Sequence, residues 1–147
     1  MKKLFALVAL ALSVSAFAAD HKVSFSYSGI ENWGRSYYSC DYVEAQTEKV
    51  LELFGAQNIE VRCSGGIEWN QAWPVSVTAK WDAPALSGRD VAETVKLRGD
   101  SWNPSCGINV KIVKTLAPLF SNVTIVKKSD SCAFQSSNYS YEFAIVR

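Results

Sequence analysis

The chain has 147 residues, of which 48% are hydrophobic and 20% charged, with 15 basic residues, 14 acidic residues and one His. This length predicts a single domain with a sizeable buried core. The near balance of charge gives no electrostatic basis for binding nucleic acid or an anionic membrane.

Residues 1–18 have the features of a secretory signal peptide. Two lysines precede an apolar run that ends at Leu12, and Ala16-Phe17-Ala18 supplies a small-residue cleavage site. The apolar run is too short to span a bilayer. We expect cleavage after Ala18, which removes the two lysines and leaves 13 basic and 14 acidic residues, a formal net charge of −1. The predicted mature chain, residues 19–147, is then one periplasmic or secreted domain.

The mature chain contains the same pattern twice, over residues of about 22–82 and 91–147. In each part a Gly, a Trp and a Cys come first, a Phe follows fourteen residues after the Cys, and a second Cys comes later: Gly29, Trp33, Cys40, Phe54 and Cys63, then Gly99, Trp102, Cys106, Phe120 and Cys132. We interpret this as a duplicated β-α-β-β unit with one disulfide in each copy.

In the first part, strict alternation of apolar and polar residues predicts a half-buried strand over residues 22–28. Asp41 and Glu44 have the spacing of a capping box at the start of a helix. Gly55 is suited to end that helix, whose apolar stripe is formed by Val43, Thr47, Val50, Leu51 and Phe54. Strands are predicted at residues 59–63 and 75–81, with a loop rich in Gly, Trp and Asn between them, and Pro84 and Gly88 mark a turn.

In the second part, alternation predicts strands around residues 94–98, 123–125 and 139–145. Asn103-Pro104 is a favourable helix start. Residues 108–116 are ambiguous, because their apolar positions fit both a strand and a helical face, and β-branching favours the strand. Comparison with the first part favours a helix, which Pro118 should end or bend.

These elements predict an α+β two-layer sandwich. Each strand has one apolar and one polar face, which is typical of a largely antiparallel sheet covered on one side, here by two helices. The architecture resembles a ferredoxin-like core, although six strands exceed its four. The first two strands of each unit should be parallel neighbours or near neighbours, because the crossover between them is right-handed.

Chain direction predicts the disulfides. If both units run the same way, each helix start lies beside the end of the following strand, which pairs Cys40 with Cys63 and Cys106 with Cys132. A disulfide that closes a loop of this size stabilises the fold by roughly 3 kcal/mol in the chain-entropy model. An even number of Cys in an exported chain favours disulfides over a metal site or a catalytic thiol.

If both units run the same way, the loops that carry aromatic residues lie at one edge of the sheet. Large rings in polar loops are typical of a recognition surface, because they offer apolar area at a low entropic cost. The predicted contact residues are Trp33, Tyr37, Trp69, Trp73 and Trp102. We expect a non-catalytic binding module without a cofactor, whose partner is a glycan, a cell-envelope polymer or a protein. In the opposing interpretation the rings fold back as lids over the core.

Other functions have weaker support in the sequence. After cleavage, His21 would be the third residue, where an amine, two amides and an imidazole could bind Cu(II) or Ni(II). Glu31, Glu68 and Asp100 could form the carboxylate pair of a small hydrolase. The predicted polar sheet face has few aromatic residues, which argues against RNA recognition. The remaining alternative is a structural or interaction protein of the envelope that acts through its sheet face or sheet edge.

Overall fold

A computed structural model describes residues 20–31, 34–69, 71–84, 86, 91–99, 106–132 and 139–147. The predicted signal peptide, Gly88 and the predicted helix start at Asn103-Pro104 lie outside these residues. None of the helices that the structure describes is long and apolar enough to cross a membrane.

The first unit contains β1 (Asp20–Tyr27), α1 (Cys40–Leu53), β4 (Gln57–Glu68) and β5 (Gln71–Asp82). Its three strands form an antiparallel sheet in the order β1-β5-β4. Two short strands, β2 (Ile30–Glu31) and β3 (Gly34–Arg35), pair with each other between β1 and α1.

The second unit has the same topology. It contains β6 (Ala92–Arg98), α2 (Cys106–Leu116), the 3-10 helix η1 (Ala117–Leu119), β7 (Val123–Ser129) and β8 (Ser140–Val146). The strand order is β6-β8-β7, so in both units the last strand lies between the other two. The repeated β-α-β-β unit is therefore present in the structure, and the first two strands of each unit are near neighbours, as expected.

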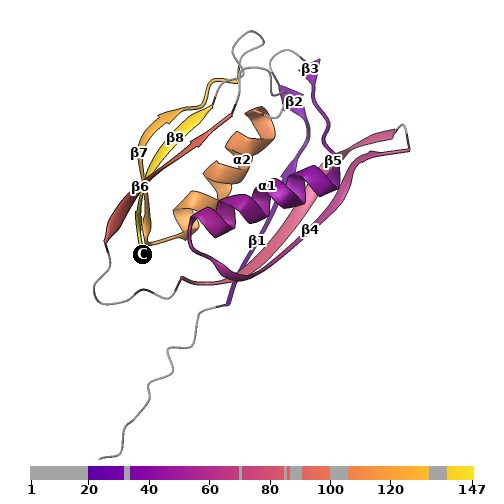
Figure 1. Ribbon diagram of the computed structural model, residues 1–147. Coiled ribbons are helices and arrows are strands. Elements are labelled where there is room, and N and C mark those ends of the chain that lie inside the picture. The colour runs from indigo at the N-terminus through magenta and orange to yellow at the C-terminus, as the bar shows by residue number, and fades with distance from the viewer. Residues whose placement is uncertain are drawn as a thin grey trace, which may run out of the picture.

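The strands form two three-stranded sheets rather than one continuous sheet. Figure 1 shows the two sheets on either side of the helix pair. The mixture of helices and antiparallel sheets fits the predicted α+β two-layer class, although the helices lie against two sheets and not against one face of a single sheet. The alternation in the sequence identifies the buried faces of β5 and β8, whereas β7 has no fully buried side chain, and the alternation contains no signal for pairing between the halves.

The inner faces of the two central strands form much of the core. Side chains at alternate positions are buried, as the alternation predicts; they are Val75, Val77, Ala79 and Trp81 in β5, and Tyr141, Phe143 and Ile145 in β8.

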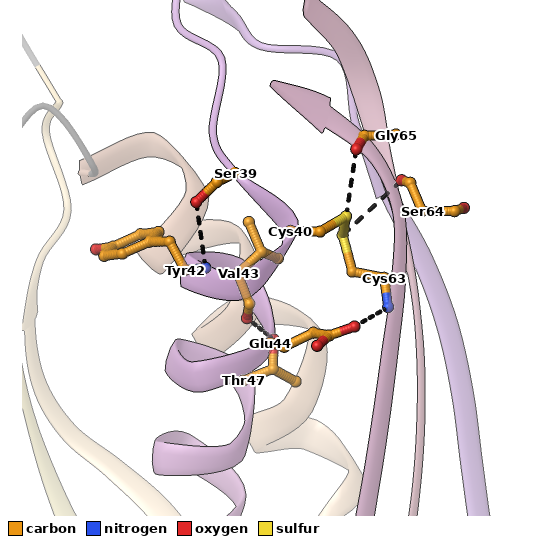
Figure 2. Close-up of a disulfide and its surroundings, with 9 residues drawn as sticks. All are labelled: Ser39, Cys40, Tyr42, Val43, Glu44, Thr47, Cys63, Ser64 and Gly65. Carbon is orange, nitrogen blue, oxygen red and sulfur yellow. Dashed lines mark hydrogen bonds between the residues drawn. A yellow bond between two sulfur atoms is a disulfide. The ribbon is translucent and has the colours of Figure 1, made fainter. Parts of the chain in front are cut away.

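Helix α1 starts differently from the prediction. The N-cap is Ser39, whose Oγ accepts a hydrogen bond from the Tyr42 backbone N–H at 3.4 Å. The predicted capping box of Asp41 and Glu44 is therefore wrong, because Glu44 turns instead toward β4 (Figure 2). The predicted apolar stripe is buried, and Gly55 ends the helix with a φ of 87°.

Residues 106–116 are helical, as the comparison between the two parts predicts. The apolar side chains that fit a helical face are buried together: Ile108, Ile112, Val113 and Leu116. Burial of this stripe therefore outweighs the strand preference of its β-branched residues. Pro118 lies in η1, where the α-helical geometry gives way to a tighter turn.

The two halves interlock through aromatic rings. Phe54, at the end of α1, packs edge-on against Phe143 in the second sheet, with 5.1 Å between ring centroids. Phe120, just after η1, stacks on Trp81 in the first sheet at 5.5 Å. The two Phe rings also contact each other at 5.2 Å, so each half completes the core of the other.

Candidate functional site

The candidate contact surface is the end of a long β-hairpin. Strands β4 and β5 are each twelve residues long, and only residues 69 and 70 separate them. The predicted loop between residues 63 and 75 is therefore wrong, because the ladder continues through Ile67↔Ala72 to Glu68↔Gln71. Figure 1 shows this hairpin extending away from the helices.

Three large apolar side chains are exposed at the hairpin end. Trp69, at the turn, is 90% exposed, Trp73 is 57% exposed, and Ile67 is 50% exposed. Trp73 lies opposite Gly66, while Ile67 pairs with Ala72 on the other face of the ribbon. We call the exposed side chains of Ile67, Trp69 and Trp73 the hairpin tip, and the part of β4 from Cys63 to the backbone of Ile67 the hairpin base.

The base of the hairpin is fixed to the segment that precedes α1. The Ile67 backbone N–H donates a hydrogen bond to the Tyr38 carbonyl at 3.0 Å. Gly66 has a φ of 82°, and a Cβ at this position would lie 2.6 Å from the same carbonyl oxygen. Only Gly permits this close approach, so Gly66 is needed for docking the hairpin onto the Tyr38 segment rather than for forming a loop.

A disulfide and a carboxylate connect α1 to β4 at Cys63, a few residues before Gly66. Cys40 and Cys63 are bonded, with 5.3 Å between their Cα atoms. Glu44 Oε1 accepts a 2.6 Å hydrogen bond from the backbone N–H of Cys63 (Figure 2). The second unit has the corresponding Cys106–Cys132 disulfide. Both pairs are those expected from chain direction.

Tyrosines pack beneath the hairpin base. The ring of Tyr38 is buried and lies 5.8 Å from that of Tyr27 and 6.1 Å from that of Tyr42. Tyr42 also accepts a hydrogen bond from Asn109 of α2 at 3.1 Å, which connects the cluster to the second unit. Tyr37, a predicted contact residue, is half-buried in the same segment.

The structure brings together only some of the predicted contact residues. Trp69 and Trp73 lie on the same hairpin, and their exposure contradicts the interpretation that they fold over the core. Trp33 and Trp102 lie outside the described residues, so their positions stay predictions. Ile67 was not predicted, because Gly65-Gly66 indicated a loop there. Trp73 continues the alternation of Val75 and Val77, which is a signal for the longer strand.

The remaining candidates are not assembled into a reactive site in the described part. Glu68 is exposed near the hairpin tip, while the Glu31 side chain and Asp100 lie outside the described residues. His21 is in β1 and stacks on Trp81 at 5.5 Å rather than belonging to a frayed terminus. Among the side chains that are placed, no three His, Cys, Asp or Glu residues are grouped to hold a metal ion. Cu(II) or Ni(II) binding at His21 stays the weaker hypothesis, beside the prediction that the protein has no metal site.

The clearest electrostatic perturbation lies away from the hairpin tip. Lys114 Nζ lies 2.7 Å from Asp130 Oδ2, and the Tyr141 hydroxyl donates to the same oxygen at 3.3 Å. The hydrogen bond from Lys114 lowers the pKa of Asp130 below its ordinary value. Burial, together with the adjacent Asp130 carboxylate, raises the pKa of Tyr141. Because these groups join α2 to β8 and the end of β7, we assign them a structural role.

Comparison with known protein families, curated proteins and solved structures found no match to this chain.

Proposed function

We propose that the protein is an exported, non-catalytic binding module that contacts a glycan, a cell-envelope polymer or a protein through the hairpin tip. The observation that carries this proposal is the exposure of Ile67, Trp69 and Trp73 on one anchored hairpin. Exposed indole rings have a large apolar area to bury on binding, and few rotatable bonds to order.

The anchoring of the hairpin supports a role in recognition. An isolated two-stranded hairpin is marginally stable in water. Here the Cys40–Cys63 bond, the Glu44 contact and the Ile67–Tyr38 hydrogen bond hold its base. A contact surface that is ordered before binding loses less conformational entropy when the partner arrives.

Two disulfides in a small domain are compatible with an oxidising compartment, which supports the export step of the proposal. The signal-peptide pattern of residues 1–18 supports it independently.

The alternative function is a structural or interaction protein of the envelope that acts through its sheet face or edge, and pairing through an edge has less support. Along the edge of β4, Glu44 and the Tyr38 carbonyl already accept hydrogen bonds from Cys63 and Ile67. Along β7, a register shift lies between Ile125 and Lys127, and lysines follow it. Bulges and lysines are features that oppose the addition of another strand.

The test compares Trp69→Ala/Trp73→Ala with Trp69→Phe/Trp73→Phe. Binding is measured by co-sedimentation with purified insoluble cell-envelope fragments. We expect the Ala pair to bind about tenfold more weakly or worse, because losing two exposed rings removes contact energy of about 1.4 kcal/mol or more. The Phe pair should retain much of the binding, since it keeps the apolar rings.

Val91→Ala/Val126→Ala is the matched control, because both valines are exposed away from the hairpin tip. This variant should bind like the unmodified protein, and all variants should have similar thermal unfolding temperatures. Unchanged binding by the Trp69→Ala/Trp73→Ala protein would refute the assignment of the hairpin tip.

A further inference from the structure

The outer face of the β1-β5-β4 sheet carries ordered rows of polar side chains. The strand register aligns Lys22 with Lys80 and Glu60 in one row. The next two rows along the strands are Ser24, Thr78 and Arg62, then Ser26, Ser76 and Ser64. We call these nine residues the outer polar face. Adjacent rows are two residues apart, which corresponds to about 7 Å along the strands.

This face is hollowed rather than flat. A groove of about 460 Å³ is lined by side chains from all three rows, among them Lys22, Arg62, Ser64, Ser76 and Lys80. Three cationic side chains share the groove with one carboxylate, Glu60, which lies 2.6 Å from Arg62 and 3.9 Å from Lys80. The groove therefore has a formal excess of two positive charges, although the predicted mature chain is close to neutral.

The compensating acidic residues are located elsewhere. Helix α1 carries four acidic residues and a single lysine: Asp41, Glu44, Glu48, Glu52 and Lys49. This helix packs against the inner side of the same sheet, so the charges of the first unit are separated between its helix and its outer sheet face. Such a separation attracts a partner of opposite charge to one face, independently of the net charge.

We propose that the outer polar face binds a strand of anionic polysaccharide, one that carries sulfate, phosphate or carboxylate groups. The cations complement the acidic groups of such a strand, and the Ser and Thr hydroxyls both donate and accept hydrogen bonds with sugar hydroxyls. This proposal is independent of the hairpin tip, because it depends on different residues.

An extended polymer fits the face better than a small ion does. The Arg62 side chain is 81% exposed and is already paired with Glu60, so it is too well hydrated to hold a single anion tightly. A polyanion instead makes several weak contacts along the rows and releases counterions as it binds. Single-stranded nucleic acid would require stacking surfaces, and all nine residues of the outer polar face are non-aromatic.

The experiment measures binding of dextran sulfate and of neutral dextran of equal length by isothermal titration calorimetry at several salt concentrations. We expect dextran sulfate to bind with an affinity that falls as salt rises, and neutral dextran not to bind. The Arg62→Gln/Lys80→Gln variant should bind dextran sulfate about tenfold more weakly, with a smaller salt dependence.

The matched control is Lys49→Gln/Lys111→Gln, which removes the same charge from exposed positions on α1 and α2. Its affinity for dextran sulfate should stay within about twofold of that of the unmodified protein. An equal loss in both double variants would show that net charge alone drives binding, and would overturn the proposal.

Two further binding measurements distinguish an anionic polysaccharide from nucleic acid and from a small anion. Tighter binding of single-stranded oligothymidylate than of dextran sulfate would assign the face to nucleic acid. Full competition by low millimolar inorganic sulfate would assign it to a small anion, and either result overturns the proposal. The Trp69→Ala/Trp73→Ala variant should bind dextran sulfate as the unmodified protein does. A wrong assignment of the outer polar face can therefore be distinguished from a wrong assignment of the hairpin tip.

Discussion

At the scale of single residues, Asp130 combines an ion pair and a hydrogen bond from a tyrosine hydroxyl on one carboxylate. It accepts from Lys114 and from Tyr141, and it lies two residues before Cys132. The carboxylate therefore connects α2, β8 and the chain segment after β7. A hydrogen bond to a charged acceptor is stronger than a neutral one, so this contact should be visible in the stability of the fold.

We expect Asp130→Asn to lower the free energy of unfolding by about 1 kcal/mol at neutral pH. The pKa of Asp130 is lower in the folded chain than the ordinary value of 3.8. Its contribution is therefore present above the unfolded pKa and disappears as pH falls through the folded pKa. Urea unfolding between pH 2 and pH 7 should show the two proteins converging in acid.

Glu52→Gln is the control for this experiment, because Glu52 is exposed on α1. Its unfolding free energy should stay within about 0.5 kcal/mol of that of the unmodified protein. An Asp130→Asn deficit that is as large at pH 2 as at pH 7 would show that packing, and not the charge, explains the effect.

At the scale of elements, the two disulfides occupy equivalent places but have different neighbours. Both join the first residue of a helix to the second strand or its following segment. Only Cys40–Cys63 adjoins the base of the projecting hairpin, where the Ile67 amide reports directly on docking. Each bond should stabilise the fold by about 3 kcal/mol in the chain-entropy model.

We therefore compare Cys40→Ser/Cys63→Ser with Cys106→Ser/Cys132→Ser by native-state hydrogen exchange. Loss of Cys40–Cys63 should increase exchange at the Ile67 amide more than at amides of β8, because the hairpin base opens locally. Loss of Cys106–Cys132 should not increase exchange at the Ile67 amide more than at other amides of the chain. Equal patterns in the two variants would refute a specific role of the first disulfide in holding the hairpin.

The elements also show which parts of the fold could be predicted. The repeated Gly, Trp and Cys spacing, together with chain direction, predicted both disulfides, and the repeat indicated that residues 106–116 are a helix although their β-branched residues favour a strand. The hairpin could not be predicted in the same way. Gly65-Gly66 is normally a loop signal, but in the structure Gly66 approaches the Tyr38 carbonyl and Gly65 approaches that of Pro74, and these contacts depend on tertiary structure.

At the scale of the whole molecule, the sequence did not reveal how charge and strands are distributed. The near-neutral composition gave no sign that α1 would be acidic while the outer face of its sheet would be basic. Alternation likewise could not distinguish one six-stranded sheet from two three-stranded sheets, because both bury the same faces. The division into two sheets arises only when the two units are placed together, whereas the charge separation already arises within the first unit, when its strands are aligned and α1 packs on the inner side of their sheet.

The contacts between the units are made by side chains more than by strand pairing. Phe54 and Phe120 cross between the halves, and the buried Asn122 side chain donates to the carbonyls of both Phe54 and Val146 at 3.1 Å. Arg147 also donates to the Leu53 carbonyl at 3.1 Å. A half without its counterpart would expose these rings and leave the amide of Asn122 without one of its partners, so we expect the two halves to unfold together.

Phe54→Ala tests this coupling, because Phe54 belongs to the first unit while its ring packs against the second sheet. The substitution should lower the free energy of unfolding by about 3–5 kcal/mol, the usual cost of removing a buried ring. Hydrogen exchange should show a similar loss of protection in β5 and β8. Denaturant unfolding should show a single transition. Leu119→Ala, at a partly exposed site in η1, should cost clearly less than Phe54→Ala. If Phe54→Ala reduced protection in β8 while β5 kept its full protection, the halves would be independent units, and the interlocked core would have to be rejected as the basis of stability.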